Sequence, residues 1–324
     1  MSAPPPSSIA VLAGGRSPER EVSLRSGHRV ETALRSKGYE AFVLDPADGR
    51  LVETLSSARI SGCYVALHGR DGEDGTVQRV LELLGVPYTG TGPRACQITF
   101  DKVLMKESLL EAGVRTPAWA TIQAAAVRDL SAGPVLSRVS ERVELPAVVK
   151  PSRAGSAMGI SFVRDERELP HAVMSALAFS DAVIVEHQVR GTEVAAAMIG
   201  AADEPMPLVE VVPRSGVFDY AARYTPGATE YHAPARLSPE FTAAVHREAS
   251  AAFRALGLRD LGRADVMLDE RGGPWVIDVN ISPGMTDTSL LPMAARAAGL
   301  DLADLCERIL DLGLQRAGEP ARPD

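Results

Sequence analysis

The chain has 324 residues, of which 45% are hydrophobic and 23% are charged, and its formal net charge is −8. A chain of this length is expected to form two or three domains. The negative charge argues against nucleic acid as a main partner, because phosphate-binding surfaces are basic, and no apolar run is long enough to cross a membrane.

The segment Met1–Ser8 is rich in proline and serine and has neither the basic start nor the apolar centre of a signal peptide. We expect this segment to be a short disordered tail. The cysteines are odd in number and far apart in the sequence, at Cys63, Cys96 and Cys306. This pattern favours neither a disulfide framework nor a zinc site, and it is typical of a cytoplasmic protein.

An apolar segment at Ile9–Ala13 ends in two glycines and predicts a buried strand that enters a turn. Ser17 and Pro18 predict the start of a helix that ends near Lys37, because serine caps helices and proline suits the first turn. The other elements expected in this part are strands at Ala41–Leu44 and Tyr64–Leu67 and a helix at Thr76–Leu84. Strands that alternate with helices predict a parallel sheet covered by helices on both faces.

The middle of the chain has a less regular pattern. The elements expected there are a helix at Lys102–Ala112 and strands at Ala118–Ile122, Ala147–Lys150, Val183–Glu186 and Val194–Ile199. Residues 123–144 are polar and poorly patterned, so they predict no regular element. Residues 151–159 form a loop rich in small residues between two strands.

Such a loop can bring backbone N–H groups close to phosphate oxygens. The segment matches neither the Walker A pattern nor the dinucleotide fingerprint, so an ordinary hairpin turn is an equal alternative. Lys150 favours phosphate binding because it places a positive charge directly before the loop. Lys102 is a second candidate, with a helix-surface lysine as the alternative. Only four of the 34 basic residues are lysines, namely Lys37, Lys102, Lys106 and Lys150.

The last third predicts a helix at 240–256, a hairpin at 263–280 and two helices after Ser289. The hairpin turn is centred between Arg271 and Gly272, which places Asp265 opposite Asp278 and Arg263 opposite Asn280. Because side chains alternate between the two faces of a strand, these four polar residues are expected on one face. The other face is expected to be a core face of Ala264, Val266, Leu268, Trp275, Ile277 and Val279.

Two opposed carboxylates repel each other unless a positive charge lies between them. Together with the Asn280 carbonyl they form an all-oxygen set that suits Mg²⁺, with phosphate oxygens completing its shell. The alternative is a solvent-facing polar side in which Arg263 pairs with Asp265. The hairpin sequence alone does not distinguish this alternative from a metal site. The segment Ser282–Thr286 then leads to a helix start whose free N–H groups favour an anion, although it is also an ordinary capped helix.

These segments together resemble the ATP-grasp superfamily and, within it, the D-alanine–D-alanine ligase family. The resemblance covers nearly the whole chain in order. It is carried by Ala13–Gly15, Glu19–Leu24, Leu67–Gly75, Pro87–Gly90, Val149–Arg153, Asp219–Tyr220 with Tyr224, Gly262–Met267 and Asn280–Thr286. It implies an α/β protein with an N-terminal parallel-sheet domain at 1–93 and two domains, at 94–187 and 188–324, that hold ATP between antiparallel sheets.

The resemblance also implies roles for individual residues. ATP would be bound by Lys102, Lys150, Glu186, His187, Val189, Glu193 and Arg223. Two Mg²⁺ ions, or Mn²⁺ in their place, would be held by Asp265, Asp278 and Asn280. The first D-alanine would be bound by Glu19 and His68, and the second by Ser289 and Leu290. A cluster that closes a mobile loop would contain Glu19, Ser156 and Tyr224. The tetrahedral intermediate would be stabilised by Arg263 and the Gly284 N–H.

The implied activity is the joining of two D-alanines through a D-alanyl phosphate for peptidoglycan synthesis, by a homodimer. A sister ligase with a changed donor or acceptor, in antibiotic biosynthesis or self-resistance, is one alternative, and a non-catalytic ATP-binding relative is another. Three positions depart from the family pattern: Asp278 stands where Glu is usual, Ala154 where an acidic residue is common, and Arg223 where Lys is usual. Tyr224 follows the pattern, which favours an amino-acid acceptor over a hydroxy acid.

Overall fold

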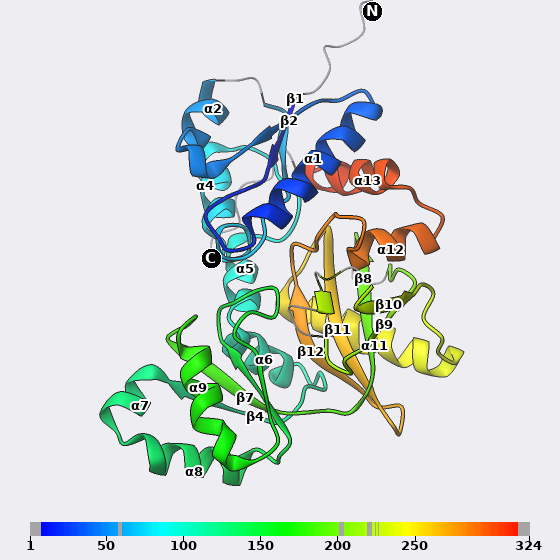
Figure 1. The fold of residues 1–324 in the computed structure, drawn as a ribbon. Coiled ribbons are helices and arrows are strands. Elements are labelled where there is room, and N and C mark those ends of the chain that lie inside the picture. The colour runs from blue at the N-terminus through cyan, green and yellow to red at the C-terminus, as the bar shows by residue number, and fades with distance from the viewer. Residues whose placement is uncertain are drawn as a thin grey trace, which may run out of the picture.

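A computed structural model of the chain describes residues 8–57, 60–200, 204–218, 222–223, 225 and 227–316. Within these residues the chain forms three β-sheets with helices packed around them (Figure 1). Residues Met1–Ser7, Asp219, Tyr220 and Tyr224 lie outside the described part, so the predictions made for them stay predictions. In the described part, no helix combines the length and the apolar surface needed to span a bilayer.

The first sheet is parallel, in the order β2–β1–β3, as the alternating pattern predicted. Strand β1 begins at Ser8, which the sequence assigned to the tail, because Ser8 pairs with Glu40 at the end of the ladder. Among the helices beside this sheet, α4 begins and ends at the residues that the sequence predicted. The elements are β1 (Ser8–Leu12), α1 (Arg20–Ser36), β2 (Glu40–Leu44), η1 (Pro46–Asp48), α2 (Leu51–Ser57), β3 (Gly62–Val65), α3 (Arg70–Glu73) and α4 (Thr76–Leu84).

The second sheet is antiparallel, in the order β4–β7–β5–β6. It is preceded by two helices, of which the second begins at Lys102 as predicted. These elements are α5 (Pro93–Phe100), α6 (Lys102–Glu111), β4 (Trp119–Gln123), α7 (Ala124–Asp129), α8 (Ala132–Arg142), β5 (Ala147–Pro151), β6 (Ser161–Val163), η2 (Glu166–Glu168), α9 (Leu169–Leu177) and β7 (Ala182–His187).

The prediction that residues 123–144 have no regular structure is wrong, because they form helices α7 and α8. Val135 and Val139 in α8, followed by Val143, are spaced four residues apart and face the same core. This apolar stripe is short, and serine and arginine occupy the other faces of the helix. Tertiary packing against the second sheet therefore stabilises a helix whose own pattern is weak.

The third sheet is antiparallel, in the order β10–β9–β8–β11–β12. One face packs against α11, and α12 contacts β8 and β9. Strands β9 and β10 were not predicted from the sequence. The elements are β8 (Gly191–Ile199), β9 (Val209–Pro213), β10 (Thr229–His232), α11 (Pro239–Leu256), β11 (Leu261–Asp269), β12 (Pro274–Asn280), α12 (Leu290–Ala297) and α13 (Leu302–Leu314).

The hairpin β11–β12 has the predicted register at its functional end. Asp265 pairs with Asp278 and Arg263 pairs with Asn280, and the register shifts between Asp265 and Val266. Ile277 is the extra residue of this β-bulge, which reverses the alternation towards the turn. Val276 therefore joins the core instead of Trp275 and Ile277, so the predicted core face is wrong at those two positions.

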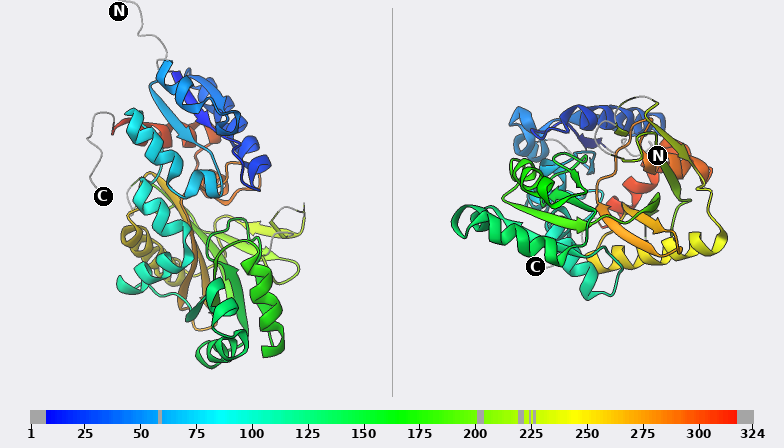
Figure 2. Two further views of the ribbon diagram at one scale, coloured as in Figure 1. Left: turned by 90° about the vertical axis from the view of Figure 1, so that its left-hand side faces the viewer. Right: turned by 60° about the horizontal axis from the view of Figure 1, so that its bottom comes forward.

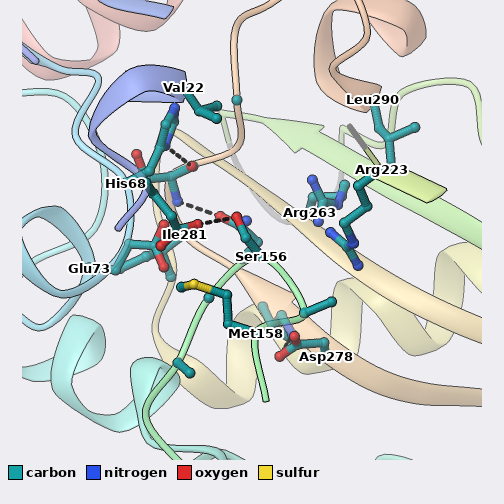
Figure 3. A pocket seen from close by; sticks show the side chains of 18 of the residues that line it. Val22, His68, Glu73, Ser156, Met158, Arg223, Arg263, Asp278, Ile281 and Leu290 are labelled. Carbon is teal, nitrogen blue, oxygen red and sulfur yellow. Dashed lines mark hydrogen bonds between the residues drawn. The ribbon is translucent and has the colours of Figure 1, made fainter. Parts of the chain in front are cut away.

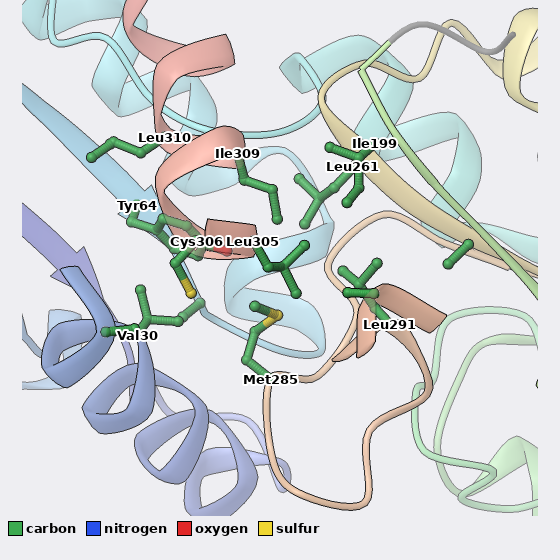
Figure 4. Close-up of a cluster of buried hydrophobic side chains, with 14 of the residues drawn as sticks. Val30, Tyr64, Ile199, Leu261, Met285, Leu291, Leu305, Cys306, Ile309 and Leu310 are labelled. Atoms are coloured by element: carbon green, nitrogen blue, oxygen red, sulfur yellow. The ribbon is translucent and has the colours of Figure 1, made fainter. Parts of the chain in front are cut away.

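The N-terminal sheet and the second sheet lie at opposite ends of the molecule, and the third sheet lies between them (Figures 1 and 2). The last helix, α13, returns to the N-terminal sheet and packs against α1 and β3. One cluster of buried side chains spans this junction, and its members include Val30, Tyr64, Met285, Leu291 and Cys306 (Figure 4). The C-terminal segment thus ties the third sheet to the N-terminal domain beside the pocket described next.

Candidate active site

A pocket lies where the N-terminal domain, the second sheet and the third sheet meet (Figure 3). Most of the residues predicted for the site line it: Glu19, His68, Lys102, Lys150, Ser156, Arg223, Arg263, Asp278, Asn280, Gly284, Ser289 and Leu290. Five others do not line it, namely Glu186, His187, Val189, Glu193 and Asp265. The pocket thus joins residues more than 200 positions apart in the sequence.

The acidic pair at the hairpin lies at one side of this pocket, where Asp278 lines the pocket and Asp265, its cross-strand partner, does not. The Asp265 carboxylate accepts two hydrogen bonds from the Arg263 guanidinium, at 2.6 and 2.9 Å, and both side chains are buried. Asp278 lies opposite, with its Oδ1 3.3 Å from the Lys102 Nζ. Burial raises the pKa of Asp278, but Lys102 and Lys150 outweigh it and lower that pKa overall. The predicted pairing of Arg263 with Asp265 is therefore confirmed, but the pair is buried and does not face solvent, and the metal site stays a prediction.

The same side of the pocket fits a divalent cation by its donor chemistry. Asp265, Asp278 and Asn280 provide only oxygen donors on one strand face, and Mg²⁺ commonly takes one or two carboxylates and keeps other positions for water or phosphate. Among the described residues, no cluster of three or more histidine, cysteine or acidic side chains could hold a metal ion. A cation at this side would therefore need the asparagine carbonyl together with oxygens from water or a nucleotide.

Two lysines bring positive charge to the pocket from the second sheet and the helix before it. Lys102 is the first residue of α6, and its Nζ also donates to the Ala154 carbonyl at 3.3 Å. Lys150 lies on β5, and its Nζ donates to Glu186 Oε1 at 2.6 Å and to the Ile277 carbonyl at 3.2 Å. Although burial disfavours the charged form, Glu186 and Asp278 raise the pKa of Lys150. Lys150 is therefore held as a cation beside the acidic hairpin, and Lys102 forms an ion pair with Asp278 there.

The loop after β5 reaches across the pocket to the N-terminal domain. The Ser156 hydroxyl donates to Glu19 Oε1, a contact between residues 137 positions apart. A Cβ atom on Gly155 would lie 2.6 Å from Glu19 Oε2, so a larger residue there would displace the Glu19 carboxylate. Burial raises the pKa of Glu19, and the Ser156 hydrogen bond opposes this shift. The predicted contact between Glu19 and Ser156 is present, and it closes the loop over the pocket.

His68 belongs to a buried hydrogen-bond chain. Its Nδ1–H donates to the Ser282 carbonyl at 3.0 Å, since a carbonyl can only accept, and its Nε2 lies 3.0 Å from the Ser26 hydroxyl. In a neutral ring with its proton on Nδ1, Nε2 carries no proton and accepts from the Ser26 hydroxyl, which itself accepts from the Met285 N–H at 3.1 Å. Burial lowers the pKa of His68 to about 4. The imidazole is therefore neutral and orients the loop that follows the hairpin.

That loop leads to the start of helix α12. Ser289 precedes α12, and its hydroxyl accepts from the Thr286 N–H at 3.0 Å. A Cβ atom on Gly284 would lie 2.7 Å from the Ser289 Oγ, so the glycine allows the loop to pass close to the helix start. Leu290 is the first residue of α12 and is buried at the pocket wall. The predicted anion-binding turn thus lies at the pocket, close to Arg263.

The predicted nucleotide ligands at the end of β7 and on β8 lie outside this pocket. Glu186 is buried between Lys150 and Lys106. The His187 ring bonds the Glu144 carbonyl at 2.9 Å, and Val189 is half-buried in the turn before β8. Burial and the nearby Asp265 carboxylate raise the pKa of Glu193 to about 7. The structure therefore leaves the assignment of these residues to nucleotide binding as a prediction.

Arg223 extends the positive charge of the pocket. Its guanidinium lies 4.4 Å from the centre of the Phe218 ring and lines the pocket opposite Asp278 (Figure 3). Its buried Nε has no hydrogen-bond partner among the described residues. A buried N–H without a partner is costly, so an anionic ligand would gain by accepting from it.

One pocket residue, Glu73, and one residue behind the pocket lining, Ser26, were not assigned a role from the sequence. Ser26 orients His68, as described above, and its only signal is its place among small residues on the buried face of α1. Glu73 lies at the end of α3 and lines the pocket. Burial and the neighbouring Glu19 raise the pKa of Glu73 well above its usual value. The segment that contains Glu73 was recognised as specific, but nothing in its spacing separates Glu73 from its acidic neighbours.

Comparisons with known proteins agree along the whole chain. A family model described as "D-ala D-ala ligase C-terminus" matches residues 109–311, and one described as "D-ala D-ala ligase N-terminus" matches residues 48–91. A D-alanine–D-alanine ligase from Pelotomaculum thermopropionicum is 40% identical over 312 residues, which cover 96% of this chain and 98% of the relative. One from Bordetella petrii is 41% identical and covers 97% of this chain and 94% of the relative.

Solved structures give the same result for the fold. A D-alanine–D-alanine ligase from Bacillus anthracis superimposes with a TM-score of 0.84 at 30% identity, covering 97% of this chain and 100% of the other. The same enzyme complexed with ATP gives a TM-score of 0.83 at 28% identity, with the same coverage. The VanG D-Ala:D-Ser ligase from Enterococcus faecalis gives 0.81 at 25% identity, covering 95% and 99%. The fold is thus the ATP-grasp fold that the sequence predicted.

Proposed function

The chain belongs to the D-alanine–D-alanine ligase family, and from this membership we infer that it is an ATP-dependent ligase that joins two D-alanine molecules for cell-wall synthesis. The observation that carries this inference to the site is the pairing of Asp265 with Asp278, which lines the pocket together with Lys102 and Glu19. That pocket combines acidic residues on the hairpin with a separate cationic residue, Lys102, and a separate anionic residue, Glu19. A nucleotide phosphate and a zwitterionic amino acid need such a combination.

We propose that ATP provides the leaving group that makes a carboxylate reactive. The first D-alanine would place its ammonium at Glu19 and its carboxylate near His68. One carboxylate oxygen would form a bond to the γ-phosphorus while the bond from that phosphorus to ADP breaks, which yields D-alanyl phosphate. Lys102, Lys150 and Arg223 would offset the charge of the transferred group.

The second D-alanine would bind with its carboxylate at Ser289 and Leu290. Its neutral amine would attack the acyl carbon, and the bond to the phosphate oxygen would then break to release inorganic phosphate and the dipeptide. Arg263 and the Gly284 N–H would stabilise the negative charge on the carbonyl oxygen, each worth roughly 3 kcal/mol. The loop held by Ser156 on Glu19 supports this scheme, because an acyl phosphate survives only where water is excluded.

We propose that Asp265, Asp278 and Asn280 hold Mg²⁺, as one or two ions, with Mn²⁺ as a substitute. When bound, the cation would supply Lewis-acid stabilisation of the phosphate oxygens. Asp278 has a shorter arm than the glutamate usual in the family, so its carboxylate reaches less far towards a cation. A homodimer in the cytoplasm and the three domain boundaries are proposed on the family resemblance alone.

A sister ligase with a different acceptor is the second candidate. The structural match to a D-Ala:D-Ser ligase favours it, together with Arg223 at the position of the usual lysine. Measurement of ADP release with ATP, Mg²⁺ and D-alanine, D-serine, D-lactate or L-alanine as second substrate separates the candidates. We expect the highest kcat/KM when D-alanine is also the second substrate. Preference for D-serine would establish the sister ligase, and ADP release that no amino acid stimulates would contradict both.

A further inference from the structure

Lys106 is a buried lysine that the reaction scheme above does not use. It is one of four lysines in the chain. Lys37 is explained by a surface ion pair with Asp304 and Glu307, and the pocket accounts for Lys102 and Lys150. Lys106 lies on α6 and is completely buried. A buried cation is costly unless its surroundings hold it for a purpose.

The surroundings of Lys106 favour its charged form. Its Nζ lies 2.5 Å from Glu186 Oε2, 2.5 Å from Thr116 Oγ1 and 3.3 Å from the Pro117 carbonyl. The Thr116 hydroxyl donates its proton to the Val276 carbonyl at 2.8 Å, so towards Lys106 it can only accept. Lys106 thus donates two hydrogen bonds and forms an ion pair with Glu186, and the ammonium form suits all three oxygens, whereas a neutral amine would turn its lone pair towards one of them.

Packing and charge agree with this assignment. The Nζ atom also lies 5.0 Å from the centre of the Trp119 ring, which stabilises a cation. Burial lowers the pKa of Lys106, and the Glu186 carboxylate opposes that shift. Burial disfavours ionisation of Glu186 as well, but the two lysines beside it lower its pKa overall. The group therefore consists of two buried cations that share one buried anion.

Glu186 connects Lys106 to the pocket. Its Oε2 faces Lys106 and its Oε1 accepts from the Lys150 Nζ at 2.6 Å, while Lys150 lines the pocket. The three side chains carry one net positive charge. Without Lys106, Glu186 and Lys150 would neutralise each other, and Lys150 would offer a phosphate little net attraction at this weakly screened site.

We propose that Lys106 is a positioning residue for ATP: it offsets the charge of Glu186, so that the Lys150 ammonium stays in place and keeps its attraction for the nucleotide. This proposal rests on the ATP-dependent function inferred above. It also gives a reason for lysine here in a chain that otherwise uses arginine. The compact ammonium meets three oxygens arranged around one point, which a planar guanidinium does not match.

The test compares Lys106→Met with the double variant Lys106→Met/Glu186→Gln. In the first, Glu186 faces Lys150 alone, and we expect the Kd for ATP to rise at least about 10-fold, with the KM for D-alanine unchanged. In the second, the net charge of the group returns to one positive charge, and we expect most of the ATP affinity to return, once any direct contribution of Glu186 to ATP binding, measured in Glu186→Gln alone, is allowed for. Lys37→Met is the matched control, with wild-type affinity expected. Calorimetric ATP binding and thermal unfolding are measured on every variant.

Several results would overturn the proposal. One is an unchanged Kd for ATP in Lys106→Met. The others are an equal loss of ATP affinity in the single and double variants, and failure of both variants to fold. Each of these last two results would assign Lys106 to packing. If only the single variant fails to fold, the double variant decides the question. A Kd for ATP within about threefold of wild type supports the proposal, and a larger rise in Kd overturns it. Wild-type protein that neither binds ATP nor releases ADP with D-alanine would instead refute the proposed function.

Discussion

Asp265 lies directly opposite Asp278 on one face of the β11–β12 hairpin, and each carboxylate contacts a different cation. Arg263 binds Asp265 through two hydrogen bonds, and Lys102 approaches Asp278 to 3.3 Å. Opposed like charges destabilise a sheet, so this pairing is retained at a cost that the neighbouring cations offset. The β-bulge at Ile277 leaves this register intact. It reverses which side chains face the core only between the bulge and the hairpin turn. We regard this pair as the centre of the site.

Removal of one negative charge at this pair should abolish most of the activity. We expect Asp265→Asn to lower turnover at least ~100-fold and Asp278→Asn to raise the Mg²⁺ concentration needed for half-maximal rate, because both changes weaken the cation site at the transferred phosphoryl group. ADP release measured across a Mg²⁺ titration checks both. Glu270→Gln, at the exposed end of the same hairpin, is the control. Near-normal turnover in Asp265→Asn would count against the assignment.

Lys150 should be essential for phosphoryl transfer. Its ammonium is held by Glu186 and the Ile277 carbonyl at the edge of the pocket. We expect Lys150→Ala to lower turnover at least ~100-fold, since charge compensation at the phosphoryl group is lost. Steady-state kinetics with saturating D-alanine make the measurement. A variant that keeps wild-type turnover would show that Lys150 does not act on the phosphoryl group.

The contact between Ser156 and Glu19 should govern how the loop closes on the first substrate. Ser156→Ala removes a hydrogen bond to a buried carboxylate, and we expect the KM for the first D-alanine to rise by about 10-fold. The rise in KM should be accompanied by more hydrolysis of ATP that is not coupled to dipeptide formation. The ratio of ADP to dipeptide reports this directly. A ratio and a KM equal to those of wild type would show that the contact has no part in closure.

His68 should make folding stability depend on pH. Its pKa is about 4 in the folded protein, compared with about 6.5 in an unfolded chain. Between these values only the unfolded state binds the proton, so this contribution is complete above pH ~6.5 and is lost as the pH falls towards 4. We expect wild type to lose about 2 kcal/mol more than His68→Gln between pH 7 and pH 4.5. Urea unfolding at both pH values gives the difference, and identical losses would exclude a neutral buried imidazole.

The elements with regular local patterns were predictable from the sequence. The helix at Thr76–Leu84 and the pairing of Asp265 with Asp278 follow from a capped apolar stripe and from a short, symmetric turn. The bulge at Ile277 was not predictable, because one extra apolar residue leaves the pattern of residue types unchanged. Helices α7 and α8 depend on contacts with the second sheet, which a local pattern does not contain.

The site was predictable in its residues but only partly in its contacts. Family motifs identified the residues that line the pocket, and the structure places most of them together. The shared use of Glu186 by two lysines was missed, because Lys106 and Glu186 are 80 positions apart and their contact depends on how α6 packs against the second sheet. The same is true of Ser26, whose link to His68 joins a helix to a distant loop.

The route of one oxygen atom tests the central claim most directly. The enzyme is incubated with ATP, Mg²⁺ and D-alanine that carries oxygen-18 in its carboxylate, and the phosphate released is analysed by mass spectrometry. A D-alanyl phosphate intermediate transfers one labelled oxygen to phosphate for each peptide bond formed, and the nucleotide product is ADP. Unlabelled phosphate, or label found in AMP, would contradict phosphoryl transfer to D-alanine at this site.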